Sequence, residues 1–301
     1  MSLAKQRMPS STLAPTKGAS GLHSVKVRRR IGHALLHVVM IALGITFMMP
    51  LAWVISTSLK LPGQVFVQPI EWIPTSPRWQ NYGEVFQRLP FLTFIRNSLF
   101  VTILGTVGTI VSSVTVAFSL SRIRWPGREV VFAVMLATMM LPGVVTLIPM
   151  FIIFKQIHWV GTFYPLWVPS WFAHAFFVFL MRQFMLTLPA ELDEAARIDG
   201  ASNFRVLWQI IVPLCGPAIA TVAIFAFLNH YNDFIGPLLY ISETNKYTIP
   251  LGLQLFQGRF GNYWHLVMAA SMVSIAPLIV LFFLAQRYFV QGIALTGLGG
   301  R

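Results

Sequence analysis

The sequence predicts an all-α integral membrane protein with six transmembrane helices, and three observations support this prediction. Of the 301 residues, 56% are hydrophobic and only 10% are charged, which is too apolar for the surface of a water-soluble protein. Six stretches of 25 to 29 residues contain no Asp, Glu, Lys or Arg. Each exceeds the roughly 20 apolar residues that a helix needs to cross a bilayer. The Lys and Arg residues also divide unequally between the loops that these stretches define.

The six uncharged stretches give the expected spans in order. They are Ile31–Leu59, Asn97–Ser121, Val130–Phe154, Gln156–Met181, Val206–Asn232 and Phe260–Gln286. Proline recurs within or beside the last four, at Pro142, Pro149, Pro169, Pro217, Pro237 and Pro277. Because proline removes a backbone hydrogen bond, it tends to kink a helix. Two interpretations stay open with equal weight: helices that bend to open a pathway, or packing irregularity.

The basic residues orient the predicted spans. With a cytoplasmic N-terminus, 15 of the 22 Lys and Arg residues fall in the cytoplasmic segments and seven fall outside. This positive-inside bias places both termini in the cytoplasm. A net charge of +13 is also typical of nucleic-acid-binding proteins. Since the charge follows the membrane loops, we expect no nucleic-acid partner.

The chain divides into three predicted regions. Residues 1–30 are polar and basic with no acidic residue, and we expect a disordered cytoplasmic tail. Residues 31–290 form the transmembrane domain, and residues 291–301 form a short cytoplasmic tail. Cys215 is the only cysteine, which excludes a disulfide within the chain, and we expect no metal site.

The connection between the fourth and fifth spans contains a predicted pair of short cytoplasmic helices. Pro189 suits a first helical turn, and three acidic residues follow it, where the helix dipole favours negative charge: Glu191, Asp193 and Glu194. Gly200 fits the left-handed position that ends a helix. Ser202 can cap a second helix that runs toward Pro213.

One face of the first short helix is predicted to be a contact surface. Helical spacing places Leu192, Ala195, Ala196 and Asp199 on this face. The small alanines allow close approach of another surface, and Glu194 and Arg197 flank it with charges. The face is equally compatible with docking a cytoplasmic partner and with an ordinary solvated loop.

The spacing of this segment resembles a signature of the membrane subunits of ABC importers, Glu-Ala-Ala-x3-Gly-x9-Ile-x-Leu-Pro. The matching residues are Glu194, Ala195, Ala196, Gly200, Ile210 and Pro213, with Val212 in place of Leu. Further stretches resemble the second permease of maltose and glycerol-3-phosphate importers: Leu141–Pro149, Leu180–Phe184, Asn232–Phe234, Pro237–Leu238 and Gln286–Gly292. The resemblance covers roughly residues 30–295, with an importer core at about 95–290.

The resemblance implies a function and a set of partners. The chain would be a multi-pass protein of the bacterial inner membrane that forms half of the translocation pathway for a sugar or sugar derivative. Its partners would be a homologous second permease, a cytoplasmic ATPase dimer, an extracytoplasmic substrate-binding protein and membrane lipid. The implied coupling helix, between the fourth and fifth spans, would contact the ATPase through Leu192, Glu194, Ala195, Ala196, Arg197, Gly200, Ser202 and Pro213. The binding protein would meet Gln257, Gly258, Asn262 and Tyr263.

Catalysis is not expected in this chain. The phosphate-binding pattern Gly-x4-Gly-Lys-Ser/Thr is absent from the sequence, so ATP and Mg²⁺ would bind the partner ATPase. We therefore expect a non-catalytic subunit with no catalytic residues and no cofactor of its own.

A polar cluster ends the fifth uncharged stretch. Asn229, Tyr231, Asn232 and Asp233 could line a translocation pathway, because sugars are bound by hydrogen bonds and aromatic stacking. The alternative, which we favour for Asn232 and Asp233, is hydrogen bonding between helices or a place near the outer interface. A secondary transporter or channel is a further alternative for the whole chain. It would need ion-coupling carboxylates or matched broken helices, and the sequence offers one candidate acid and no evident repeat.

Overall fold

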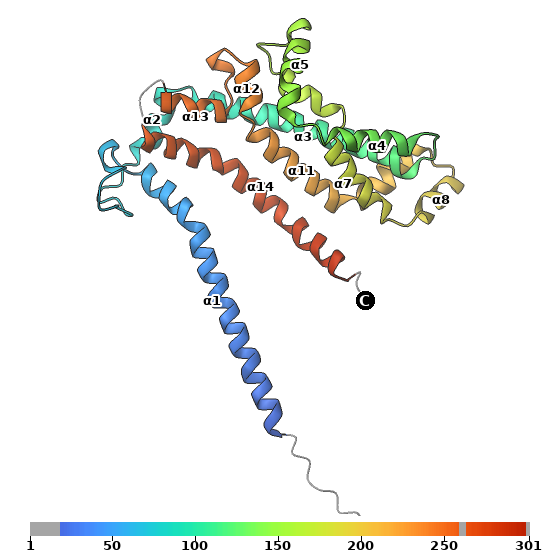
Figure 1. Ribbon diagram of the computed structural model, residues 1–301, viewed down its shortest axis with the longest axis horizontal. Helices are drawn as coiled ribbons and strands as arrows, with labels where there is room; N and C mark the ends of the chain where they lie inside the picture. The colour runs from blue at the N-terminus through green and yellow to red at the C-terminus, as the bar shows by residue number, and fades with distance from the viewer. Residues whose placement is uncertain (1–18, 259–262, 299–301) are drawn as a thin grey trace, which may run out of the picture. The chain divides into compact units, whose positions relative to one another are not determined.

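The computed structural model describes residues 19–258 and 263–298, and among them the only regular structure is helical. Side chains are described for residues 31–257 and 263–284. The chain forms two compact units, Met1–Trp53 and Val54–Arg301, which are treated separately (Figure 1). All the contacts discussed below lie within the second unit.

The first long helix, α1 (Ala19–Ser58), begins earlier than the sequence predicts. We placed the end of a disordered tail at residue 30, but the helix already includes residues 19–30, and residues 1–18 lie outside the described residues. The physical reason is continuity: no proline occurs between Pro15 and Pro50, so nothing in the backbone stops the helix before the apolar stretch. Its Ile31–Ser58 part is long and apolar enough to cross a membrane.

The second unit contains thirteen further α-helices among the described residues. They are α2 (Gln80–Arg88), α3 (Phe91–Arg122), α4 (Arg128–Thr138), α5 (Gly143–Gln156), α6 (Tyr164–Trp167), α7 (Ala175–Leu186), α8 (Glu191–Ile198), α9 (Asn203–Arg205), α10 (Val212–Leu214), α11 (Gly216–Tyr231), α12 (Ile235–Tyr240), α13 (Ile249–Gly258) and α14 (Trp264–Leu298). The described residues also form 3₁₀-helices at η1 (Pro62–Gln64), η2 (Val168–Trp171) and η4 (Thr244–Lys246). The segment η3 (Val206–Ile211) is a π-helix.

The predicted spans appear as single segments and as bent pairs. Four segments are long and apolar enough to cross a membrane: Ile31–Ser58, Phe91–Arg122, Tyr164–Leu186 and Trp264–Leu284. Two pairs meet the same criteria only together: α4 and α5, bent by 100°, and Asn203–Leu214 with α11, bent by 81°. The described residues therefore hold four to six candidate spans.

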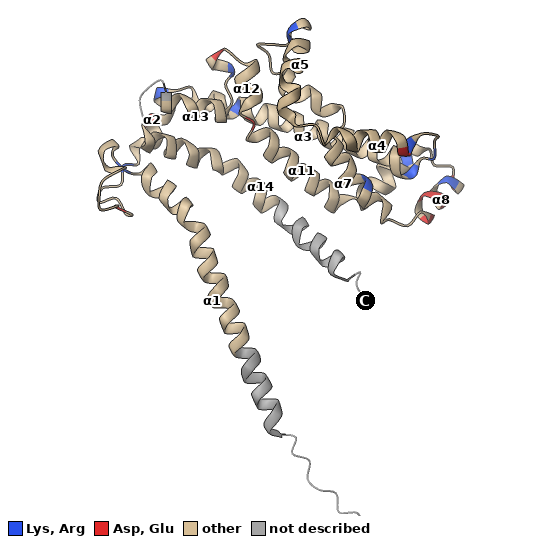
Figure 2. Ribbon diagram, viewed as in Figure 1, with Lys and Arg blue, Asp and Glu red and all other residues tan. Residues whose placement is uncertain are grey.

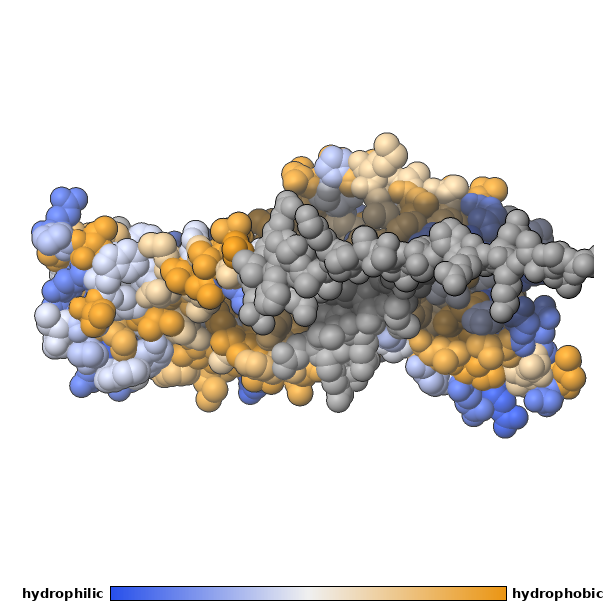
Figure 3. Space-filling view, turned by 90° about the horizontal axis from the view of Figure 1, so that it is seen from below, coloured by the Kyte–Doolittle hydropathy of each residue, from blue (hydrophilic) through white to orange (hydrophobic). Residues whose placement is uncertain are grey.

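The bends occur beside proline and glycine. Pro142 has an extended backbone and precedes Gly143 at the start of α5, while Gly216 and Pro217 begin α11. Proline cannot donate the hydrogen bond that would continue the preceding helix, so each stretch breaks here. Figure 2 shows that charged residues gather at the ends and loops of the second unit, leaving the middles of the long helices α3 and α11 uncharged. On the face in Figure 3, hydrophobic side chains likewise dominate between more hydrophilic ends.

Helix α3 is the scaffold of the second unit, and it packs against α7 and α11 (Figure 1). Its inward face alternates glycine and small hydroxyl residues with apolar ones, so neighbouring helices approach closely. Gly105 contacts the ring of His230 on α11, and Gly108 contacts the ring of Trp171 on η2. The His230 Nε2 atom lies 3.1 Å from Ser170 Oγ, and Ser112 Oγ donates to the Ser170 carbonyl at 2.9 Å.

The segment that joins α12 to α14 packs against the start of α3. Asn97 Nδ2 donates to the carbonyls of Asn245 and Tyr247, at 2.9 and 3.0 Å. Ser98 Oγ accepts from the Ile249 backbone N–H at 2.7 Å. Gly252 on α13 packs against the ring of Phe94. These contacts fix residues 244–258 to the core.

The tight contact at Gly105 generates a prediction about stability. A Cβ atom at this position would lie 2.6 Å from the His230 ring, which is held between α3 and η2, so Gly105→Ala should lower the free energy of unfolding by about 1–3 kcal/mol. The matched control is Gly83→Ala on α2, where the new methyl meets open space and helix propensity adds about 1 kcal/mol. Melting temperatures of the two purified variants should shift in opposite directions. An unchanged melting temperature for Gly105→Ala would contradict this packing.

Candidate functional site

The predicted pair of short helices is present between α7 and η3. Helix α8 has three acidic residues in its first turn and Arg197 in its last turn. Gly200 has φ +80°, the left-handed conformation that the sequence predicts for a helix end. Ser202 caps α9, and its Oγ accepts from the Arg205 backbone N–H at 3.4 Å. The local geometry predicted for Gly200 and Ser202 is therefore confirmed.

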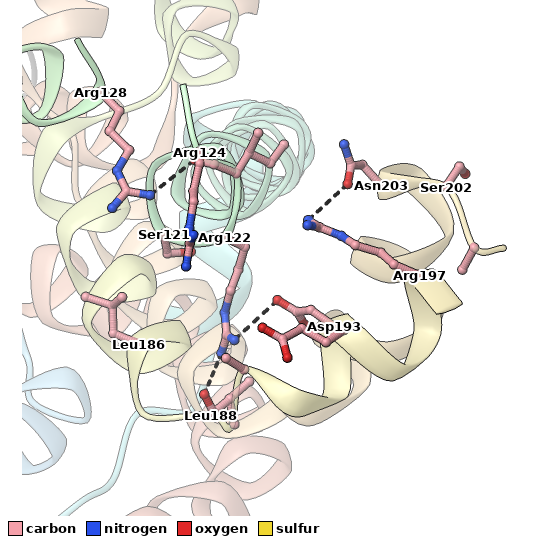
Figure 4. Close-up of a pocket in the computed structure, with 14 residues that line it drawn as sticks. Ser121, Arg122, Arg124, Arg128, Leu186, Leu188, Asp193, Arg197, Ser202 and Asn203 are labelled. Carbon is pink, nitrogen blue, oxygen red and sulfur yellow. Dashed lines mark hydrogen bonds and ion pairs between the residues drawn. The ribbon is translucent and has the colours of Figure 1, made fainter. Parts of the chain in front are cut away.

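Arg122, the last residue of α3, attaches this pair of helices to the membrane core. Its guanidinium donates to the Leu188 carbonyl at 2.8 Å, to the Pro189 carbonyl at 3.4 Å and to the Met185 carbonyl. It also forms an ion pair with Asp193 of α8, with 3.3 Å between Nη1 and Oδ2. Figure 4 shows the Arg122 and Asp193 side chains pointing toward each other below Arg124.

This ion pair is buried, so the loss of either partner would lower the stability of the fold. Only 6% of the Arg122 side chain and 7% of the Asp193 side chain are exposed. Arg122 also donates to the Met185 and Leu188 carbonyls at the C-terminal end of α7, where the helix dipole favours a positive charge. Removing one partner of a buried pair typically costs 3–5 kcal/mol, because the other charge is left uncompensated. The position of α8 is therefore strongly specified relative to α3 and α7.

A second arginine, Arg182 on α7, joins α3, α4 and α7 at the same end. It contacts both carboxylate oxygens of Glu129, at 3.2 and 3.1 Å. Its guanidinium carbon lies 4.1 Å from the centre of the Phe132 ring, and its Nε donates to the Leu120 carbonyl at 3.3 Å. Both Glu129 contacts come from Arg182 Nη2, whereas the stacking of the guanidinium on Phe132 and the Nε hydrogen bond are characteristic of arginine and would be lost with lysine.

The exposed face of α8 differs in part from the predicted face. Leu192, Ala195 and Asp199 are exposed as expected, but Ala196 is buried and packs in the same apolar core as Val206 and Met185. The reason is that Asp193 pairs with Arg122, and Ala196, three residues later, turns inward with it. In this conformation Ala196 contacts the core of the chain itself, and its contact with a partner stays a prediction.

Apolar side chains extend the exposed surface beside α8. Ile198 is 86% exposed at the end of α8, and Phe204 is 73% exposed on α9. Glu194 and Arg197 are also exposed, and Pro213 is exposed farther along, on α10. We define the outer face of α8 as Leu192, Ala195, Ile198, Asp199 and Phe204.

Behind α8 lies a polar pocket of about 810 Å³. Its walls come from the end of α3, the following loop, the end of α7, and α8 with the turn to α9 (Figure 4). The charged lining residues are Arg122, Arg124, Arg128, Arg197, Asp193 and Glu194. Arg197 donates to Asn203 Oδ1 at 3.2 Å across the turn.

The predicted pathway residues of α11 divide into two groups. Tyr231 is 3% exposed, and its hydroxyl donates to the Ser274 carbonyl on α14 at 2.7 Å, so it is not available to a pathway here. Asp233 Oδ1 accepts from the Gly236 N–H at 3.0 Å and thereby caps α12. Asn229 on α11 and Asn232, the residue directly after it, are exposed, and Asn232 Nδ2 donates to the Leu228 carbonyl at 2.9 Å. The alternative of a structural role therefore fits Asp233, and it also fits Tyr231, which we had assigned to the pathway.

The predicted contact residues for a binding protein are only partly described. Gln257 is exposed near the end of α13, Gly258 ends that helix, and Asn262 lies outside the described residues. Tyr263 is half-buried, with the Arg88 guanidinium 4.8 Å from its ring centre.

Sequence reasoning did not identify Arg122, Asp193 and Arg182 as partners in this site. Each was counted only as a loop charge or a helix-terminal charge. The available signal was an arginine at the C-terminal end of each of two uncharged stretches, together with the few acidic residues in the loops that follow. Their pairing joins segments 53 to 71 residues apart, which local pattern does not reveal.

Comparisons with known proteins agree with the fold. Residues 108–295 match the family described as binding-protein-dependent transport system inner membrane component. The chain is 32% identical, over 96% of its length and 100% of the relative, to the sulfoquinovosyl glycerol transport system permease protein SmoH of Agrobacterium fabrum. It is 31% identical to the trehalose/maltose transport system permease protein MalG of Thermococcus litoralis, over 86% of this chain and 94% of that one.

A solved structure shares the fold. It is the crystal structure of a bacterial ABC transporter involved in the import of the acidic polysaccharide alginate, with a TM-score of 0.75 and 24% identity. The match covers 92% of this chain and 100% of that chain. With the family match over most of the chain, the secondary transporter and channel alternatives are set aside. The chain belongs to the inner membrane components of binding-protein-dependent transport systems, as a permease subunit of an ABC importer.

Proposed function

We propose that this permease forms half of the translocation pathway for a sugar or sugar derivative and receives the motion of a partner ATPase through α8 and the turn at Gly200. The observation that supports this most directly is the two-sided construction of α8. Its inner side is joined to the membrane core by the buried pair between Arg122 and Asp193. Its outer face is exposed and partly apolar. Both termini and the loop that carries α8 would lie in the cytoplasm, with six spans in all.

The outer face of α8 has the properties of a docking surface. Exposed apolar side chains such as Ile198 and Phe204 at a cytoplasmic end are stabilised when a partner covers them. Ala195 lets the partner approach closely, and Glu194 and Arg197 offer charges at the edge. A cytoplasmic ATPase dimer would hold ATP and Mg²⁺, and its closure would move α8 together with α3 and α7. This chain would itself be non-catalytic.

The exposed amides of α11 support a place for the substrate. Asn229 and Asn232 lie near the end of an apolar helix, where amides facing lipid would be unfavourable. We place them toward the pathway or toward a homologous second permease, where they can hydrogen-bond to sugar hydroxyls. The named substrates of the relatives, sulfoquinovosyl glycerol and trehalose or maltose, are carbohydrates, which supports the substrate class. An extracytoplasmic binding protein would deliver the sugar near Gln257.

The docking role is tested by placing a large, charged side chain on the outer face of α8. Ala195→Arg should reduce co-purification of the ATPase and substrate uptake at least about tenfold, because the new charge would be desolvated without a partner. The chain should remain in the membrane, since Ala195 is exposed. Thr187→Arg, at an exposed position that ends α7, is the matched control and should leave both unchanged. Full co-purification and uptake with Ala195→Arg would rule out docking at this face.

The proposed topology is tested by labelling single cysteines. In a Cys215→Ser background, Ser202→Cys should react with a membrane-impermeant maleimide only from the cytoplasmic side, and Gln257→Cys only from the outside. Both positions are exposed, whereas Cys215 is buried. Intact spheroplasts and inverted vesicles distinguish the two sides. Labelling of Gln257→Cys in inverted vesicles alone would refute the topology.

A further inference from the structure

The pocket behind α8 has an excess of positive charge that the fold itself does not use. Four arginines line it, against two carboxylates, and Asp193 is already paired with Arg122. No hydrogen bond or ion pair joins Arg124 to any of the described side chains or backbone groups. Figure 4 shows Arg124 and Arg197 extending from opposite walls of the pocket. The volume of about 810 Å³ can accommodate a polar group together with part of an attached chain.

The arginines retain donors that can bind an anion. Arg128 uses its Nε toward Glu129 at 3.1 Å and its Nη1 toward the Ile123 carbonyl at 3.3 Å. Arg197 uses its Nη2 toward Asn203. A guanidinium carries five N–H donors, so each keeps several for a ligand. Ser202 adds a hydroxyl donor to the lining, since its Oγ accepts from Arg205 and keeps its own hydrogen.

The position of the pocket indicates where the anion comes from. The uncharged stretch of α3 ends at Ser121, so Arg122, Arg124 and Arg128 follow directly after a membrane span. Immediately beyond Arg128, α4 exposes apolar side chains, and these are Val130, Val131 and Val134. Arginines between a span and a lipid-facing apolar helix lie at the level of the phospholipid headgroups. The cytoplasmic leaflet is the anionic one, and basic pockets on that side attract its headgroups.

We propose that this pocket binds a phosphate group, supplied by the headgroup of an anionic phospholipid, between Arg124 and Arg128 on one wall and Arg197 on the other. The phosphate would tie α8 to the loop after α3 through charge-assisted hydrogen bonds. Bound lipid would thus limit the movement of α8 independently of its outer face. The site extends beyond the proposed transport function, because binding can be measured without uptake.

The test uses the full-length chain, purified with the subunits that accompany it, and native mass spectrometry of lipid adducts. Short-chain phosphatidylglycerol should bind in preference to phosphatidylcholine of the same chain length. In the double variant Arg124→Gln/Arg128→Gln, binding should fall about 25-fold, since each of the two basic residues near an anionic lipid contributes roughly a fivefold factor. The matched control is Arg205→Gln, an exposed arginine of α9 outside the pocket, which should bind as the wild type does. Arg124→Lys/Arg128→Lys should retain most binding and shows that the fold tolerates change there.

Three outcomes distinguish the possibilities. Preferential phosphatidylglycerol binding that depends on Arg124 and Arg128 supports the site and its lipid source. If inorganic phosphate binds with the same dependence and the two lipids bind equally, the phosphate site stands and the lipid source is refuted. Equal binding of both lipids together with no phosphate binding, or binding unchanged in the double variant, overturns the site.

Discussion

The arrangement of α8 and its neighbours depends on one buried guanidinium, that of Arg122. It is the last residue of α3, and it contacts carbonyls within and just after the last turn of α7 and the carboxylate of Asp193 on α8 at once. A charge with so little access to water is stable only while these acceptors surround it. The same constraint places α8, orients its outer face and forms one wall of the polar pocket. Glu129 and Arg182 add a second, more exposed link among α3, α4 and α7.

The packed helices of the second unit form the rigid body to which the ion pair between Arg122 and Asp193 joins α8. Glycines 105 and 108 allow the His230 and Trp171 rings to lie directly on α3. Tyr231 joins α11 to α14 through the Ser274 carbonyl. Because packed helices resist continuous deformation, a displacement of α8 is passed to several helices together. The bends at Pro142 and at Gly216–Pro217 mark where two spans are interrupted, and they accord with the proline pattern of the sequence.

Much of the fold and part of the site could be predicted from the sequence, and the remainder depended on contacts between distant segments. Charge spacing identified the apolar stretches, since lipid excludes charge over a length that the helix rise determines. Local chemistry identified the left-handed Gly200 and the cap at Ser202. The inward turn of Ala196 and the burial of Tyr231 could not be predicted, because each follows from a partner elsewhere in the chain. The early start of α1 was missed because polar composition alone does not end a helix.

The most direct measurement is uptake per ATP hydrolysed by the reconstituted importer that carries Asp193→Asn, with Asp193→Glu as the charge-preserving comparison. If the pair with Arg122 makes α8 move with α3 and α7, the neutral variant should still hydrolyse ATP while uptake per ATP falls at least about tenfold, because the buried arginine loses its counter-charge. The glutamate variant should recover part of the coupling. Wild-type uptake per ATP in Asp193→Asn, in protein of unchanged melting temperature, would contradict the central role of this ion pair.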